Sequence, residues 1–345
     1  MRKLRLTIVG FGTAGRWLAA AVHHRRAFLA AECDVAVAIV GIATRRGGFI
    51  HHEEGLDIDR LLERAPGRTL ADHPGARWWE TAREGLANTE SDVLAEASNT
   101  NPREPEPALS HIRHALQRGV HVVTSSKGAC AAAAVELLAL ARERRVRFRM
   151  ESTVMSGTPV LGTIREGLAG ARVRALRGIL NGTANHILTR MAEGLDYPAA
   201  LADAQARGYA EPDPADDVDG HDVVAKARIL AAVAFGQALA LEDVARAGIA
   251  DIGREAIDAA VRDGRRIKLV ASLRAPPDGD GPLEARVEPL ALPLADPLAR
   301  IDGVANALVA ETDTMREVII VGPGAGPEQA GQGMFADLAA VARLV

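Results

Sequence analysis

The sequence contains few cysteines and few aromatic residues. Its only two cysteines, Cys33 and Cys130, cannot form a disulfide framework or a four-thiolate zinc site. We expect both to be small buried residues. Aromatic residues make up 3% of the chain, so the core must consist of aliphatic side chains and alanine. Surfaces on which nucleic-acid bases could stack are therefore not expected.

Long hydrophobic runs are also missing. No apolar stretch approaches the roughly 20 residues that span a bilayer, and no signal-peptide hydrophobic region follows the first strand-like segment. The formal net charge of −4 gives no electrostatic reason to expect a nucleic-acid or membrane partner. The 345 residues, 48% of them apolar, are enough for two domains. We therefore expect a folded cytoplasmic protein.

The first 150 residues alternate between strand-like and helical segments. A strand, a glycine-containing turn, a helix and a second strand occupy 4–9, 10–15, 16–30 and 34–43. The same alternation continues with strands at 92–97, 120–124 and 146–150, and with helices at 108–118 and 131–143. This order predicts a parallel sheet with helices on both faces, in a Rossmann-type α/β domain.

The strict alternation ends after about Glu151. Alanine-rich helical stretches cover 187–206 and 221–246, and four strand-like runs follow at 267–274, 283–292, 306–311 and 317–321. They predict an α+β domain for substrate binding and dimerisation, in a homodimer. We expect the amphipathic C-terminal helix, 327–344, to return to the first domain. The predicted domains are thus 1–145 with 326–345, which binds a dinucleotide, and 146–325.

The first motif is a glycine turn between a strand and a helix. Gly10 allows the tight turn, Gly12 lets a pyrophosphate approach the backbone, and Gly15 permits close packing of helix on strand. Thr13 and Ala14 then begin the helix, whose first N–H groups face the phosphates. In this context the spacing predicts a dinucleotide site rather than a simple tight turn.

The end of the second strand bears on the choice of dinucleotide. An NAD site usually has an acidic residue there, which binds the ribose 2′-hydroxyl. This chain has Thr44, Arg45 and Arg46 instead. Two guanidinium groups suit a 2′-phosphate, so we expect NADP to be preferred over NAD. The alternative is that both arginines are simply solvated on a loop.

Three further features contain residues that could bind or react with a substrate. Gly182 and Thr183 begin a helix, where they could bind a carboxylate or belong to a helix cap without a ligand. Asp222 and Lys226 are four apart on one helix face, where they could transfer a proton or form an exposed ion pair. The acidic run before them is not a calcium loop, because Lys226 occupies the last position, which requires Glu. Lys127 follows a strand, where it could lie near the nicotinamide or at the surface.

Taken together, these segments resemble homoserine dehydrogenases. The most specific segments are 178–188 and the run from Gly208 to Pro214 that continues to Lys226. The resemblance also includes 151–159 and 322–326, and it covers nearly the whole chain in order. It implies reversible, NAD(P)-dependent interconversion of L-homoserine and L-aspartate 4-semialdehyde, in threonine and methionine biosynthesis.

The resemblance also implies roles for single residues. Lys226 corresponds to the proton donor with Asp222 beside it, and Lys127 lies at the nicotinamide end. The implied substrate-binding residues are Glu211, Asp217, Gly182 and Thr183. The implied cofactor contacts beyond the glycine turn are Thr100, Lys127 and Gly326. A monovalent cation, sodium in the family, would bind at Glu151, Val154, Ser156 and Thr158.

The sequence departs from the family pattern at two loops. Many members have Thr-Ala-Asn-Lys where this chain has Thr124-Ser125-Ser126-Lys127, and small residues where it has Met155 and Ser156. It has no room for a regulatory ACT domain, so threonine feedback through one is not expected. Two alternatives remain: another amino-acid-linked NAD(P) dehydrogenase, which in one case would use Cys130 as a nucleophile, and a catalytically silent NADP-binding sensor.

Overall fold

The computed structural model describes residues 1–344 except 65–68, 99–100 and 278–280. The chain divides into two compact units, one formed by 1–157 with 326–345 and the other by 158–325. The division thus lies later than the predicted boundary after residue 145. The reason is that the segment after 145 contains β7 (Phe148–Arg149), which pairs with the preceding strand, and a short turn that packs on the C-terminal helix.

The first unit is built on a seven-stranded sheet in the order β4-β3-β2-β1-β5-β6-β7. Five neighbouring strands, β2, β1, β5, β6 and β7, run parallel, as the alternating sequence predicts. The antiparallel β3 and β4 extend one edge and were not predicted. The bounds of the strands besides β7 are β1 Arg2–Val9, β2 Val35–Thr44, β3 Gly48–His51, β4 Arg77–Trp79, β5 Val93–Glu96 and β6 His121–Thr124.

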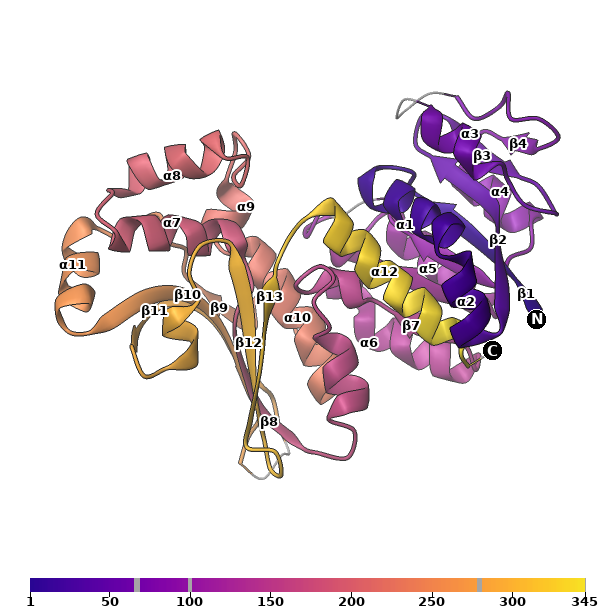
Figure 1. Cartoon of the computed structure of the whole chain (residues 1–345). Helices are drawn as coiled ribbons and strands as arrows, with labels where there is room; N and C mark the ends of the chain where they lie inside the picture. Colours follow the sequence, from indigo (N-terminus) through magenta and orange to yellow (C-terminus); the bar gives the residue numbers. More distant parts are fainter. Residues whose placement is uncertain (65–68, 99–100, 278–280, 345) are drawn as a thin grey trace. The chain divides into compact units, whose positions relative to one another are not determined.

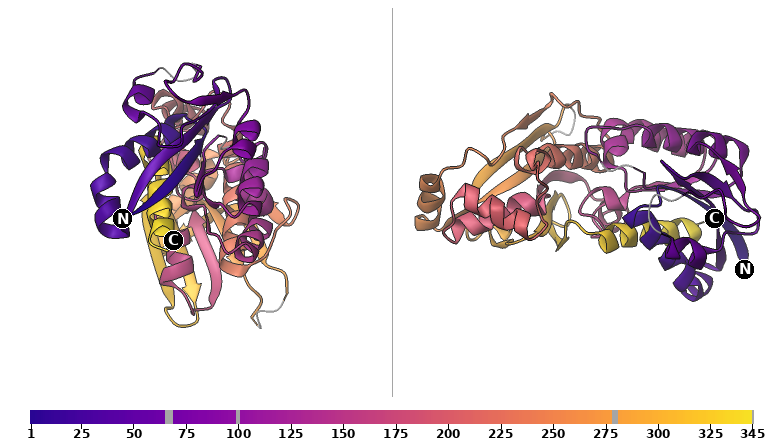
Figure 2. Two further views of the ribbon diagram at one scale, coloured as in Figure 1. Left: turned by 90° about the vertical axis from the view of Figure 1, so that its right-hand side faces the viewer. Right: turned by 90° about the horizontal axis from the view of Figure 1, so that it is seen from above.

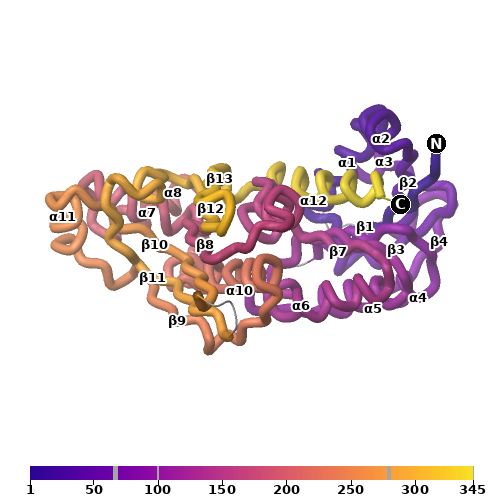
Figure 3. Tube along the Cα trace, turned by 90° about the horizontal axis from the view of Figure 1, so that it is seen from below, coloured from indigo at the N-terminus to yellow at the C-terminus, as the bar shows by residue number. Residues whose placement is uncertain are grey.

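Helices cover both faces of this sheet. Figures 1 and 3 show α1, α2, α3 and α12 along one face and α4, α5 and α6 along the other. The predicted helix 16–30 is two helices that meet at Arg25, and α6 begins at Lys127 rather than 131. The helices are α1 Thr13–His24, α2 Arg26–Cys33, α3 Ile58–Glu63, α4 Ala82–Asn88, α5 Ala108–Gln117, α6 Lys127–Glu143 and α12 Pro327–Ala342.

The second unit contains a six-stranded sheet in the order β13-β12-β8-β10-β11-β9. Neighbouring strands are antiparallel except for β11 and β9. Its core includes Ile179, Val270 and Val309. The strands are β8 Val173–Ile179, β9 Val244–Arg246, β10 Arg265–Arg274, β11 Glu284–Pro293, β12 Ala305–Thr312 and β13 Glu317–Pro323.

The helices of the second unit are shorter than the alanine-rich stretches suggest. The predicted helix 187–206 is split near Gly194, and the stretch 221–246 stops being helical at Gly236, both glycines having positive φ. Helices α7 and α10 pack on the sheet, and Figure 2 shows this layer from two further directions. The helices are α7 Gly182–Ala192, α8 Tyr197–Ala206, α9 Ala215–Val218, α10 His221–Phe235 and α11 Arg254–Arg262.

The fold class is therefore confirmed: a Rossmann-like unit is joined to a second unit with a mixed sheet. Among the described residues, none of the helices is both long enough and apolar enough to cross a membrane.

Candidate active site

The carboxyl ends of four strands in the first unit meet at one edge of the sheet. Val9 pairs with Glu96, and Glu96 pairs with Thr124, so β1, β5 and β6 end at the same level. The N–H of Gly10 donates to the carbonyl of Ala43 on β2, 2.9 Å away. The glycine turn, the loop 44–47 (the Thr44 loop) and the start of α6 therefore lie along the edge where open α/β sheets bind ligands.

The three glycines of the turn have different surroundings. Gly10 has φ of +95°, and a Cβ on it would lie 2.3 Å from the carbonyl carbon of Ala97. A Cβ on Gly15 would lie 2.0 Å from the carbonyl oxygen of Gly10. A Cβ on Gly12 would meet nothing within 4 Å. Gly10 and Gly15 are therefore required by the fold itself, whereas Gly12 leaves open space above the backbone.

That open space lies at the beginning of α1. Gly12 is the N-cap residue and has no side chain to cap the helix, so the N–H groups of the first turn, which contains Thr13 and Ala14, remain available to an anion. Two further buried groups lie after β6: the hydroxyls of Ser125 and Ser126 have no hydrogen-bond partner among the described residues. These groups fit a bound dinucleotide.

The other predicted cofactor residues of the first unit have varied positions. Thr44 accepts a hydrogen bond from the N–H of Gly47 (2.8 Å), which closes the turn that presents Arg45 and Arg46 to solvent. Lys127 is the first residue of α6, and Gly326 precedes α12 with φ of +129°. Thr100 lies outside the described residues.

A buried polar cluster occupies the second unit. The Nζ of Lys226 lies 2.6 Å from Oδ2 of Asp222, and it donates to the carbonyl of Leu180 at 2.5 Å. The Nδ2 of Asn181 donates to Asp222 (3.0 Å) and to Asp217 (2.6 Å). Side chains of α10, α9 and the loop before α7 are thus joined in one network. Lys226 and Asp222 are therefore not an exposed ion pair, which was one of the two alternatives that their spacing left open.

Asp217 is the member of this cluster whose pKa is raised. Burial raises the pKa of its carboxyl above the usual range, and the negative charge of Asp222 adds to the effect, while the hydrogen bond from Asn181 opposes it. The site therefore contains two close carboxylates, one ammonium and one amide. Such a cluster can bind a cationic group and exchange a proton with a neighbouring oxygen.

The start of α7 provides a possible carboxylate site beside this cluster. The side chain of Asn181 caps the helix by accepting from the N–H of Ala184 (2.8 Å), while the N–H groups of Gly182 and Thr183 belong to the first turn. The hydroxyl of Thr183 donates to the carbonyl of Tyr209 (2.7 Å). Glu211 is exposed on the loop that follows Tyr209.

The predicted cation ligands fall in both units. Glu151, Val154 and Ser156 belong to the first and Thr158 to the second, where its hydroxyl donates to the carbonyl of Pro323 (2.9 Å). Met155 and Ser156 have φ of 54° and 53°, the left-handed region that glycine adopts most easily.

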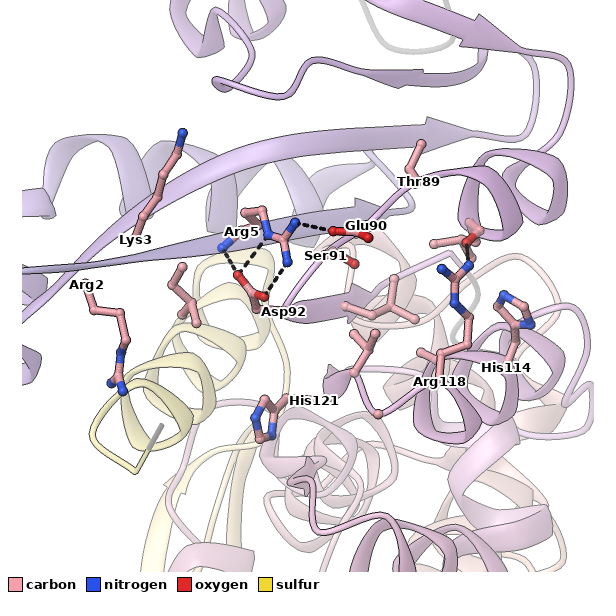
Figure 4. Close-up of a pocket in the computed structure, with 16 residues that line it drawn as sticks. Arg2, Lys3, Arg5, Thr89, Glu90, Ser91, Asp92, His114, Arg118 and His121 are labelled. Atoms are coloured by element: carbon pink, nitrogen blue, oxygen red, sulfur yellow. Dashed lines mark hydrogen bonds and ion pairs between the residues drawn. The ribbon is translucent and has the colours of Figure 1, made fainter.

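The first unit also contains a cavity of about 490 Å³ at the opposite, amino edge of the sheet. Figure 4 shows Arg5 inside it, paired with Asp92 and Glu90. Burial would raise the pKa of Asp92, but the hydrogen bonds from Arg5 hold it below its usual value. Arg5 is already paired with two carboxylates, and the glycine turn lies at the other edge of the sheet, so nothing in this cavity points to the dinucleotide.

Comparison with known proteins decides the family. A family model described as homoserine dehydrogenase matches residues 159–339, and one described as the NAD-binding domain of homoserine dehydrogenase matches 10–151. The NAD(+)-dependent homoserine dehydrogenase of Pseudomonas canavaninivorans is 38% identical over 98% of this chain and 96% of its own. The chain belongs to the homoserine dehydrogenase family. It is therefore an NAD(P)-dependent oxidoreductase, and the resemblance seen in the sequence is confirmed.

Solved homoserine dehydrogenases have the same fold. That of Thiobacillus denitrificans superposes with a TM-score of 0.84 at 30% identity, covering 100% of this chain and 74% of the other. A hyperthermophilic archaeal homoserine dehydrogenase in complex with NADPH gives 0.80 at 31% identity, covering 97% and 96%.

Membership in the homoserine dehydrogenases also removes the alternative that needs a cysteine nucleophile. Cys130 is completely buried in α6, and burial raises the pKa of its thiol far above the neutral range.

One residue of the buried cluster, Asn181, was not singled out from the sequence. The available signal was its position before Gly182 and Thr183, since asparagine is a preferred N-cap residue.

Proposed function

We propose that Lys226 is the proton donor and acceptor of this homoserine dehydrogenase and that Asp222 positions it. The observation that supports this role is the buried ion pair, which holds the ammonium in one place. In the direction of homoserine oxidation, neutral Lys226 would take the proton of the substrate hydroxyl while a hydride leaves the carbon that bears this hydroxyl. In the reverse direction its ammonium would protonate the aldehyde oxygen.

The substrate would bind through its amino-acid end. The carboxylates of Glu211 and Asp217 suit its ammonium group, and the first N–H groups of α7, at Gly182 and Thr183, suit its carboxylate. The exposed position of Glu211 leaves it accessible to a substrate. This arrangement selects a small amino acid rather than a simple alcohol.

The dinucleotide would bind at the glycine turn, with its pyrophosphate over Gly12 and its nicotinamide toward Lys127 and the buried hydroxyls of Ser125 and Ser126. When bound, it supplies the hydride acceptor or donor. Thr100 and Gly326 complete the proposed contacts. We propose that NADP is preferred, because the Thr44 loop presents two arginines and no acidic residue. The named relatives include both an NAD(+)-dependent enzyme and an NADPH complex.

The test is homoserine oxidation by two variants of Lys226. Lys226→Ala should lower kcat by roughly 100-fold or more without weakening NADP binding. Lys226→Arg keeps the charge but cannot release a proton near neutral pH, so it should lose activity to a similar extent. Lys3→Ala, which removes a surface lysine paired with Glu54, is the control. Near-normal turnover by Lys226→Arg would exclude the proposed role.

We further propose a cytoplasmic homodimer that associates through the second unit. Strand β13 lies at the end of the sheet, and its Ile319 and Val321 are 46% and 53% exposed. An edge strand with exposed apolar side chains favours association with another chain. Light scattering of the wild type and of Ile319→Asp tests this, since the variant should dissociate.

Sodium is a further proposed ligand. The carboxylate of Glu151, the carbonyls of Val154 and Ser156 and the Thr158 hydroxyl are all oxygen donors, the ligand type that a hard cation prefers. Among the described residues no group of three or more His, Cys, Asp or Glu side chains could hold a metal, so backbone oxygens must contribute. Turnover measured in sodium and in choline chloride at equal ionic strength tests the proposal.

A further inference from the structure

The chain uses lysine at very few positions. Of its 41 cationic Lys and Arg residues only four are lysines, at positions 3, 127, 226 and 268. Lys3 lies at the surface, and Lys127 and Lys226 already have proposed roles. Lys268 lies in the middle of β10 and is 1% exposed. A lysine in a chain that otherwise prefers arginine, buried completely, requires a specific explanation.

The ammonium of Lys268 is surrounded by three oxygen acceptors. It donates to Oδ1 of Asn185 at 3.1 Å, to the carbonyl of Ile301 at 2.5 Å and to Oδ1 of Asp302 at 2.9 Å. Three acceptors match the three N–H donors of a lysine. A planar guanidinium is larger and presents its donors in a fixed fork, so arginine could not satisfy the same acceptors.

These acceptors connect two parts of the second unit. Asn185 lies in the first turns of α7, and its Nδ2 donates to the carbonyls of Ile301 and Ala305 (3.0 and 3.1 Å). The N–H of Gly303 donates to Thr189, one turn further along α7 (3.1 Å). The loop 301–305 is thus attached to α7 along its length, with the Lys268 ammonium at the junction.

The same loop also contacts the beginning of α7 directly. A Cβ on Gly182 would lie 2.7 Å from the carbonyl oxygen of Val304, so the loop backbone is in close contact with Gly182. On its other side, the turn is held by the hydrogen bond from Thr183 to Tyr209 and by the Asn181 network. The position of Gly182 and Thr183 therefore depends on where the loop 301–305 lies.

We propose that Lys268 is a positioning residue for substrate binding: through Asn185 and the carbonyl of Ile301 it fixes the loop 301–305 against α7, and thereby the Gly182–Thr183 turn. This inference rests on the proposed function, because it takes that turn as the site of the substrate carboxylate. Lys268 itself is buried beneath the loop and would not touch the substrate.

The test is the steady-state kinetics of Lys268→Met, which keeps the length of the side chain and removes its charge and donors. Displacement of the turn weakens binding in the ground state and the transition state alike, so KM for homoserine should rise about tenfold with kcat within threefold. The Kd for NADP should not change. A lysine with only a structural role would lower the folded fraction, and hence the apparent kcat, without a change in KM.

Two further variants keep the test decisive. Arg266→Met, on the same strand, removes a guanidinium that donates to the carbonyl of neighbouring Arg265 and to no acceptor of the loop 301–305 among the described residues, and it should leave KM unchanged. If Lys268→Met does not fold, Asp302→Asn decides, because Asp302 is 61% exposed and the amide oxygen of asparagine can still accept a hydrogen bond from the Lys268 ammonium, although without the charge. It should raise KM about threefold, and an unchanged KM would overturn the inference.

The same assay separates this inference from the proposed function. If Lys226→Arg is inactive and Lys268→Met is folded with a normal KM, the catalytic proposal stands and the positioning role of Lys268 is wrong. If Lys226→Arg turns over normally, the catalytic proposal fails, whatever Lys268→Met does.

Discussion

The ammonium of Lys226 lies 2.6 Å from the carboxylate of Asp222, one turn earlier on α10, and each side chain is only 7% exposed. Removing one member of a buried ion pair leaves the other charge without compensation, which costs about 3–5 kcal/mol. We expect Lys226→Met to lower the free energy of unfolding by about this amount. Lys226→Met combined with Asp222→Asn should recover part of the loss, as denaturant unfolding would show.

A second pair with the same spacing provides the control. Arg254 and Asp258 on α11 are also four residues apart and 2.9 Å from each other, but they are 44% and 41% exposed. The corresponding substitutions there should change the free energy of unfolding by less than about 1 kcal/mol, because exposed pairs contribute little. Equal losses of unfolding free energy at both pairs would show that burial does not determine how much such an ion pair contributes to stability.

The glycine turn gives a prediction that separates binding from stability. Gly12→Ala places its Cβ in open space, so the variant should fold with a normal melting temperature. It should nevertheless weaken NADP binding at least tenfold, because the new methyl group occupies the space proposed for the pyrophosphate. Calorimetric titration with NADP and a thermal scan measure the two effects.

Gly15→Ala is the comparison for this prediction. Its Cβ would lie 2.0 Å from the backbone oxygen of Gly10, and backbone cannot move aside as a flexible side chain can. This variant should therefore lose stability by about 1–3 kcal/mol through overpacking. Gly12→Ala with normal NADP affinity would place the dinucleotide elsewhere.

The sequence predicted the Rossmann-like unit well because its strands have strong local signals. The run before Gly10 is β-branched and apolar, and the glycine spacing identifies the turn. The strands β3 and β4 were missed because they are short and interrupted by irregular segments, so neither gives a clear period. Their positions are decided by pairing with β2, which no local pattern encodes.

The residue types of the candidate site could be predicted from the sequence, but the contacts that join these residues could not. The i,i+4 spacing places Asp222 and Lys226 on one helix face, yet it does not say whether that face is buried. Burial comes from the packing of α10 on the sheet. The acceptors around Lys268 come from α7 and the loop before β12. Such contacts between distant segments cannot be read from periodicity.

The Thr44 loop allows a prediction about cofactor choice. Arg45→Ala and Arg46→Ala each remove an exposed guanidinium, and a charge-assisted contact to a 2′-phosphate contributes enough that the Kd for NADPH should rise about tenfold or more. The Kd for NADH should stay nearly constant. Arg26→Ala, an exposed arginine at the start of α2, is the control. Tighter binding of NADH than NADPH by the wild type would contradict the preference.

The raised pKa of Asp217 gives a prediction about pH. Because the folded-state pKa lies above the ordinary value, the folded protein binds this proton more tightly than the unfolded chain does. The free energy of unfolding therefore falls as pH rises from the ordinary pKa through the raised one. Above the raised pKa, the penalty for burying the ionised carboxylate stays constant. Asp217→Asn removes the penalty, since a neutral amide can still accept from Asn181.

The variant should thus unfold at a higher temperature than the wild type at pH 7, and the difference should shrink toward pH 4. Asp263→Asn, an exposed position at the end of α11, should show no such trend with pH. Asp217→Asn should also raise KM for homoserine, because it removes a charge from the proposed ammonium site. A variant less stable than the wild type at pH 7 would show that the carboxylate contributes more through its hydrogen bond with Asn181 than its burial costs.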